Sequence, residues 1–163
     1  MNRKLCIGLF AIGLLVAGVR LVAAEQEHEH MHSAGVATPA ADTRQLVRFP
    51  EPLREHELAN MRDHLMTLQR IQDALGSGEF EKAADLAEQR LGMSSFKLHG
   101  AHEVAPYMPQ GMQDIGTAMH RAASRFARAA QEAGATGDLK ASIAALSRVT
   151  EQCVACHAAY RLN

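Results

Sequence analysis

The sequence predicts an all-α protein, an antiparallel four-helix bundle, and three observations support this prediction. From Pro50 onward, apolar residues recur at spacings of three and four in four separate stretches, which is the period of one helix face. Short glycine-containing links join the first stretch to the second and the third to the fourth, and short links favour antiparallel neighbours. No stretch of useful length alternates apolar and polar residues as a strand would.

The first two helices precede a long irregular connection. The first is expected from about Leu53 to Leu75, where the GSG segment of residues 76–78 ends it. Its apolar stripe consists of Leu58, Met61, Leu65, Leu68, Ile71 and Leu75. The second begins near Phe80 and stops at Gly92. Its apolar positions are Phe80, Ala83, Ala84, Ala87 and Leu91.

The last two helices follow the connection MSSFKLHGAHEVAPYMPQG, which glycine and proline interrupt. The third helix ends near the GATG segment of residues 134–137, and its stripe is Met112, Ile115, Met119, Ala122, Phe126 and Ala130. Asp138 is the expected N-cap of the fourth helix. The inner stripe of that helix is Leu139, Ile143, Leu146, Thr150 and Cys153.

The N-terminus has the three-part layout of a secretory signal peptide. A basic start, NRK, precedes the uncharged apolar run LCIGLFAIGLLVAGV, and small residues before Glu25 offer a cleavage point. The run is shorter than the ~20 residues of a membrane-spanning helix. Residues 1–24 are therefore expected to be removed, which would leave the protein in the periplasm without a stable membrane anchor. A retained anchor is the alternative.

Residues 25–49 are expected to be a disordered, His-rich tail, followed by one domain over residues 50–163, because the tail has no apolar period. Removal of the signal takes three of the basic residues and leaves 14 Lys and Arg against 18 Asp and Glu. A mildly acidic chain without a basic stripe is not expected to bind nucleic acid. No nucleophile–base set or phosphate-binding glycine loop indicates an enzyme.

The segment CVACH near the end of the chain has the pattern of covalent haem attachment. Two intervening residues place the sulfurs of Cys153 and Cys156 about one helical turn apart, and His157 follows Cys153 by four residues on the same side of the helix. An imidazole is a usual proximal ligand of haem iron. A Cys153–Cys156 disulfide is one alternative, although thioredoxin-like sites belong to strand-rich folds. A zinc site would need further ligands, and no other cysteine remains after signal cleavage.

With the signal peptide and four helices, the segment CVACHAAYR resembles the cytochrome c prime family. The resemblance covers about residues 49–163 and is specific at the C-terminal motif. It implies one covalent haem c, with Cys153 and Cys156 as the thioether positions and His157 as the proximal iron ligand. Arg161 would lie near the haem edge, or else pair with the dipole at the C-terminal end of the last helix. A homodimer through the first two helices is also implied.

In that family the distal residue comes from the inner face of the first helix. Members with an apolar residue there are five-coordinate and bind small gases, whereas relatives with a methionine are six-coordinate and low-spin. Met61 is the best match, because it lies between Leu58 and Leu65 on the apolar stripe. Met66 is one residue off the stripe, about 100° around the helix from Leu65. The alternative role of Met61 is core packing. His64 is the runner-up distal ligand, or else a boundary residue, and the absence of a sixth ligand also stays open.

The remaining histidines and methionines allow further sites. The tail tract HEHMH offers imidazoles to copper, nickel or zinc, or is a solvated polar segment; its residues are His28, His30, Met31 and His32. His99 and His102 could form a second metal site or cover a haem edge. Met108 and Met112 are expected to pack in the core. His120 is expected to be a hydrogen-bonded histidine at the boundary of the third helix.

Three functions from different classes remain. The first is a periplasmic mono-haem c-type cytochrome that exchanges single electrons with redox partner proteins. The second is a five-coordinate haem protein that binds nitric oxide or carbon monoxide. The third is a haem-free periplasmic bundle that handles metal ions through its His-rich tail. The first agrees best with the motif and with Met61 as a ligand, since a methionine ligand raises the reduction potential.

Overall fold

The structure of the chain, a computed structural model, describes residues 41–163. The predicted signal peptide and the HEHMH tract lie outside the described residues. The described part is mostly helical, which confirms the all-α class. Within residues 41–163, no helix combines the length and the apolar character needed to cross a membrane.

The four predicted helices are present close to their predicted bounds. They are α1 (Glu51–Gly76), α2 (Phe80–Arg90), α4 (Gln110–Thr136) and α5 (Leu139–Ala159). Residues 91–109, the crossing segment, connect α2 to α4. This segment contains the short helix α3 (Ala101–Val104) and two 3-10 turns, η1 (Met93–Ser95) and η2 (Ala105–Tyr107).

Local sequence explains where the helices begin and end. Pro50 immediately precedes α1, and a second proline lies in the first turn, where the missing N–H costs no hydrogen bond. Gly137 follows α4 in the left-handed conformation, with φ of 78°, which favours glycine. The Asp138 carboxylate accepts a hydrogen bond of 3.1 Å from the backbone N–H of Ala141. The predicted N-cap of the last helix is therefore confirmed.

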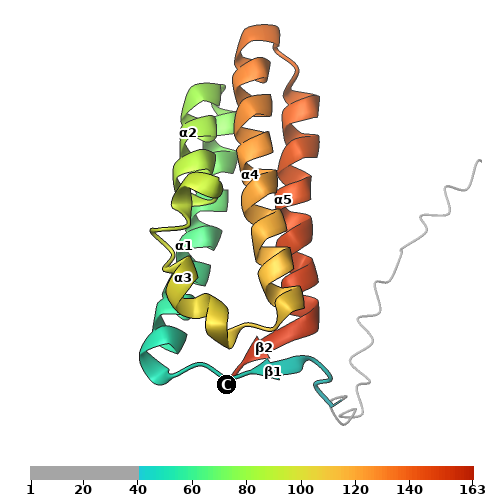
Figure 1. Cartoon of the computed structure of the whole chain (residues 1–163). Coiled ribbons are helices and arrows are strands. Elements are labelled where there is room, and N and C mark those ends of the chain that lie inside the picture. Colours follow the sequence, from blue (N-terminus) through green and yellow to red (C-terminus); the bar gives the residue numbers. More distant parts are fainter. Residues whose placement is uncertain (1–40) are drawn as a thin grey trace, which may run out of the picture. The chain divides into compact units, whose positions relative to one another are not determined.

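The long helices run lengthwise beside one another (Figure 1). The most extensive helix contacts are between α4 and α5, between α2 and α4, and between α1 and α2. The helices α1 and α5 do not approach each other comparably closely. Because α1 and α5 are not packed directly against each other, side chains or another group must lie between them.

Two short strands were not predicted from the sequence. Strand β1 (Gln45–Val47) pairs in parallel with strand β2 (Tyr160–Leu162), with Leu46 opposite Arg161. Val47 and Phe49 are 2% and 4% exposed. The end of the predicted disordered tail is therefore part of the folded domain, and the domain begins before residue 50.

The apolar core consists of two separate clusters. The larger lies among α1, α2, α4 and α5 and centres on Phe126, which is fully buried. Alanines of α2 and α4 pack in this cluster, and their small side chains let helices approach closely. The smaller cluster surrounds Val47, Phe49 and Val104 near the strand pair. Met108 and Met112 pack against it, which confirms their predicted packing role.

The inner face of α1 differs from its predicted apolar stripe. Leu65 was placed on the stripe, but it is 70% exposed. The buried positions of α1 are Glu57, Asn60, Thr67, Ile71, Ala74 and Leu75. Its N-terminal half therefore turns polar side chains inward. This polar half of α1 faces the part of the domain described next.

Candidate functional site

The CVACH segment occupies the last turns of α5, immediately before β2. Cys153 and Cys156 are both free and partly buried, whereas His157 is exposed. Cys153 packs against the larger apolar cluster, and its Sγ atom lies 3.6 Å from the carbonyl oxygen of Val149. The helix therefore places both sulfurs toward the interior and leaves the imidazole accessible.

Both thiols are held in their neutral form. Burial raises the pKa of Cys153, and burial followed by the nearby charges of Cys153 and Glu57 raises the pKa of Cys156. A thiol–disulfide exchange site needs a thiolate and usually a lowered pKa. The raised values weigh against the alternative in which the two cysteines form a thioredoxin-like redox site.

The part of the domain beside the motif contains few buried apolar side chains. In α4 none of residues 110–118 is buried, and in α5 nothing after Val149 is buried. In α1 the only buried residues before Thr67 are Glu57 and Asn60. We call this part the polar layer (Glu57, Asn60, Cys153 and Cys156). Few side chains beside the motif are therefore fully buried, and those that are carry polar groups.

Glu57 is the buried carboxyl group of this layer. It is 6% exposed and accepts a hydrogen bond of 3.2 Å from the side-chain amide of Asn60. Burial raises the pKa of Glu57, while the hydrogen bond from Asn60 opposes the rise. The same amide donates to the carbonyl oxygen of His99 at 3.2 Å. Asn60 thus links the polar layer to the crossing segment.

The candidate distal residues differ in their exposure. Met61 lies on α1 next to Asn60 and is partly buried, whereas Met66 is 52% exposed. Burial therefore supports the choice of Met61 over Met66. His64 is also partly buried, but its Nε2 lies 3.3 Å from the Nε2 of His99. Its contacts are thus with the crossing segment, and its role as a ligand stays a prediction.

A cluster of three histidines was not predicted from the sequence. His64, His99 and His120 come from α1, the crossing segment and α4, and their ring centroids are separated by 4.6, 5.4 and 6.3 Å. His99 and His120 are 5% and 7% exposed. Burial, with the neighbouring imidazoles, lowers the pKa of both His64 and His99 to about 4. Burial also lowers the pKa of His120.

The predicted pairing of His99 with His102 is not observed. His99 points into the cluster, while His102 is exposed and lines a separate surface pocket with Phe96. Within residues 41–163, no three histidine, cysteine, aspartate or glutamate side chains already form a metal-binding arrangement. His120 makes a hydrogen bond of 2.7 Å to the carbonyl oxygen of Leu91, which confirms that its ring is satisfied, although it is more buried than expected.

The residues after the motif are fixed by the N-terminal segment. Arg161 lies in β2, outside the last helix, and its Nε is 3.4 Å from an Asp42 carboxylate oxygen. The prediction that Arg161 lies on the last helix, as a partner of the helix dipole, is therefore wrong. The proximity of Arg161 to a haem stays a prediction. Arg44 donates to the backbone oxygen of His157 at 3.4 Å. A side chain at Gly111 would meet the Tyr160 hydroxyl at 2.6 Å, so a larger residue there would force the Tyr160 side chain to shift.

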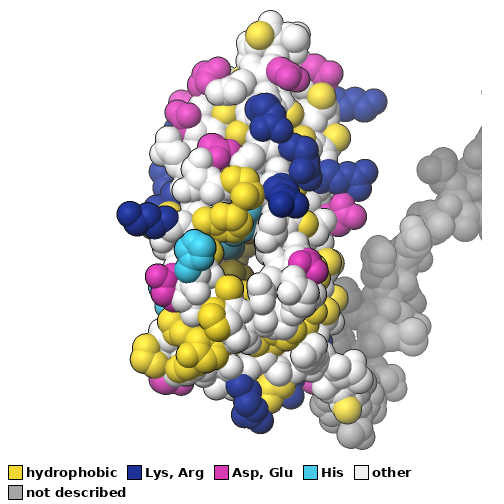
Figure 2. All heavy atoms as spheres, in the orientation of Figure 1, with side chains coloured by type: hydrophobic (Ala, Val, Ile, Leu, Met, Phe, Trp, Pro, Cys, Tyr) yellow, Lys and Arg dark blue, Asp and Glu magenta, His cyan; other side chains and the backbone are white. Residues whose placement is uncertain are grey.

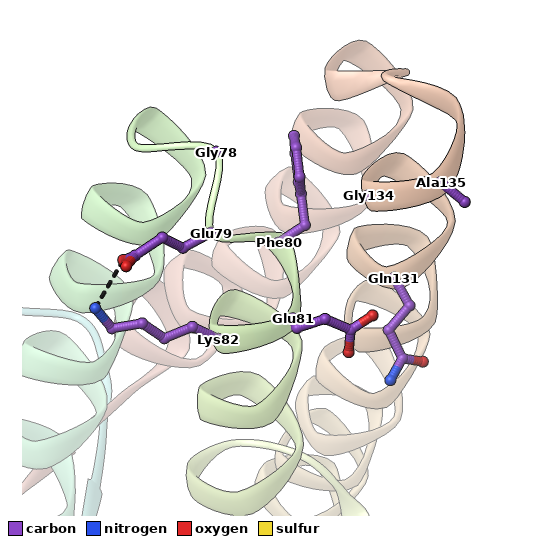
Figure 3. Close-up of a pocket in the computed structure, with 8 residues that line it drawn as sticks. All are labelled: Gly78, Glu79, Phe80, Glu81, Lys82, Gln131, Gly134 and Ala135. Carbon is purple, nitrogen blue, oxygen red and sulfur yellow. Dashed lines mark hydrogen bonds and ion pairs between the residues drawn. The ribbon is translucent and has the colours of Figure 1, made fainter.

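A second pocket lies where α2 begins beside the last turns of α4 (Figure 3). Lys82 and Glu79 form an ion pair of 2.7 Å at its rim, and Phe80 packs against Gly134. No histidine or cysteine lines it, and its charged groups face solvent. Nothing in this pocket indicates a cofactor site.

Comparison with known proteins gives no match to any family, curated protein or solved structure. The functional argument therefore depends on the residues themselves. The observation of greatest weight is that Cys153 and Cys156 belong to the polar layer, where α1, α4 and α5 have no fully buried apolar side chain.

Proposed function

We propose that the protein is an exported mono-haem c-type cytochrome that transfers single electrons, with a cytochrome c prime-like four-helix bundle as its fold. The observation that carries the proposal is the position of the CVACH segment. Cys153 and Cys156 face the interior at the level where α1, α4 and α5 lack buried apolar side chains. An apolar domain would ordinarily be packed densely at this level, so the arrangement favours a bound group there.

The donor set fits covalent haem. The two cysteine sulfurs lie about one helical turn apart on α5, and they would form the thioether bonds. His157 follows on the same helix, and its exposed ring is free to turn toward the iron as proximal ligand. When bound, the haem would supply an iron centre that gains or loses one electron.

The chain itself would hold this centre and limit its contact with water. The strand pair and the hydrogen bond from Arg44 to the His157 carbonyl hold the end of α5 in place. The two apolar clusters would limit the access of water to this centre. Met61, partly buried on α1, is the proposed distal ligand. Two protein ligands that both stay bound would suit rapid electron exchange with redox partner proteins, since little would have to rearrange.

Covalent attachment is the first test. The full chain, produced with haem-maturation machinery, is expected to carry one haem by intact mass and by the pyridine haemochrome spectrum. The Cys153→Ala/Cys156→Ala variant should lose covalent haem, and Val154→Ala, at a position 67% exposed between the two cysteines, should keep it. Absence of covalent haem in the unmodified chain would reject the proposal and favour the haem-free metal-handling alternative.

The spin state tests the type of haem protein. A low-spin ferric spectrum and slow binding of carbon monoxide by the reduced protein are expected for electron transfer with two protein ligands. A high-spin ferric spectrum with rapid carbon monoxide binding would instead favour the five-coordinate gas-binding protein.

A further inference from the structure

The cluster of His64, His99 and His120 lies apart from the haem motif and is not used in the proposed electron transfer. We propose that these three imidazoles bind one divalent transition-metal ion of the zinc class. The metal would connect α1, the crossing segment and α4. Imidazole is a preferred ligand of zinc, copper and nickel, and three histidines with one open position are a common zinc ligand set.

The spacing of the rings agrees with such a site. The Nε2 atoms of His64 and His99 are 3.3 Å apart. Two nitrogens bound tetrahedrally at 2.0–2.1 Å from zinc would be separated by about 3.3–3.4 Å. In the same geometry, ring centroids lie roughly 5 Å from one another. The observed separations of 4.6, 5.4 and 6.3 Å bracket that value.

Hydrogen bonds fix which nitrogens are available. The Ser95 hydroxyl donates to the carbonyl oxygen of Gly92 at 2.7 Å, so toward the histidines it acts as an acceptor. The Nδ1 of His99 lies 3.3 Å from this hydroxyl oxygen, and the Nδ1 of His120 lies 2.7 Å from the Leu91 carbonyl oxygen. Both Nδ1 atoms therefore carry the proton, which leaves both Nε2 atoms unprotonated. A backbone carbonyl that fixes the tautomer is typical of metal-bound histidine.

Metal binding would require two changes in the observed cluster: one proton on His64 has to move, and the ring of His120 has to shift. Because the His99 Nε2 is unprotonated, the His64 Nε2 must be the donor in their mutual hydrogen bond. The metal would replace that proton, which moves to the Nδ1 of His64. The three rings do not yet enclose one point. The His120 ring has to shift while its Nδ1 keeps the hydrogen bond to the Leu91 carbonyl oxygen; in the described part of the chain its Nε2 makes no hydrogen bond that has to break.

The surroundings allow binding at neutral pH. The lowered pKa values of His64 and His99, about 4, leave these rings neutral and free to donate a lone pair. Figure 2 shows histidine side chains at the edge of a hollow on one face of the domain.

Zinc titration of the haem-loaded full chain tests the proposal. The background variant His28→Ala/His30→Ala/His32→Ala removes the tail tract, whose imidazoles would add binding of their own. At pH 7, calorimetry is expected to give one zinc ion per chain. His64→Gln and His99→Gln should each weaken the zinc affinity about tenfold or more. His102→Gln, an exposed position in the same segment, should leave it unchanged.

Zinc X-ray absorption of the same background protein needs no cluster variant and remains informative if those variants unfold. Three imidazole ligands per zinc are expected. A zinc shell without imidazole, or no zinc bound at micromolar concentration, would overturn the proposal and identify the cluster as hydrogen-bonded histidines only. Unchanged zinc affinity in folded His99→Gln protein would overturn it as well.

Discussion

Met61 is the single residue on which the coordination of the proposed haem depends. The Met61→Ala variant is expected to change the ferric spectrum from low-spin to high-spin and to lower the reduction potential, because the thioether ligand is lost. Met66→Ala is the matched control, since Met66 lies on the same helix but is 52% exposed. Optical spectra and redox titration of the two haem-loaded variants provide the measurement.

Two outcomes would contradict this assignment. An unchanged spectrum in Met61→Ala would exclude the thioether as a ligand. Loss of the low-spin signal in His64→Gln alone would assign the position to His64, and with it would remove one ligand of the proposed zinc site.

At the scale of single residues, sequence proximity decided what could be predicted. Cys153, Cys156 and His157 are neighbours in the chain, so their spacing is sufficient to indicate the chemistry. His64 and His99 are 35 residues apart, and His120 lies on another helix. Only the path of the crossing segment brings them together, and no local pattern encodes that path. The cluster therefore needed the structure.

The N-terminal end of helix α5 is capped by the side chain of one residue. The Asp138 carboxylate caps its first turn through the Ala141 amide. The Asp138→Ala variant is expected to lower the free energy of unfolding by about 1 kcal/mol, because the Ala141 amide at the start of the helix loses its acceptor. Lys140→Ala, at an exposed position in the same turn, is the control and should change it little. Urea unfolding measures both, and equal losses in the two variants would contradict the capping role.

The strand pair is the element that secures the end of the motif. Val47 is 2% exposed, and its carbonyl oxygen accepts from the Asn163 amide at 3.2 Å. Val47→Asp would place a charge in the smaller apolar cluster. We expect hydrogen exchange of the amides of residues 160–162 to accelerate about tenfold or more, since burying such a side chain contributes roughly 1.5–3 kcal/mol. Gln45→Asp introduces the same charge at an exposed position of β1 and should leave the exchange rates nearly unchanged.

The features that the sequence did not predict have two different physical causes. A strand of three residues is too short to display an apolar period, so β1 and β2 gave no signal. The apolar pattern of α1 was misleading for another reason. Glu57 and Asn60 face the interior while Leu65 faces solvent, and a rule that equates apolar with buried cannot identify such a face. Polar inward residues are typical of a site and not of a packed core.

On the scale of the whole molecule, the two halves of the domain differ in the kind of side chain that they bury. The apolar cluster around Phe126 is large and closed, while the other half combines a small apolar cluster with buried polar groups. The histidine cluster and Glu57 both belong to this second half, and their pKa values are shifted in opposite directions. The stability of the molecule should therefore depend on pH.

For the metal-free protein, stability is expected to rise with pH between about pH 4 and pH 6.5. Over this range the folded state keeps His64 and His99 neutral, with pKa values of about 4, while the unfolded chain protonates them at the ordinary value of 6.5. The unfolded state then binds more protons, so acid favours unfolding. The raised pKa of Glu57 acts in the opposite direction above its ordinary value of 4.5, but it is one group against three, because burial lowers the pKa of His120 as well. Urea unfolding at a series of pH values, with a chelator present, measures the slope. His99→Gln should reduce that slope, whereas His102→Gln should preserve it; a slope that is flat or reversed in the unmodified protein would show that the cluster is protonated in the folded state.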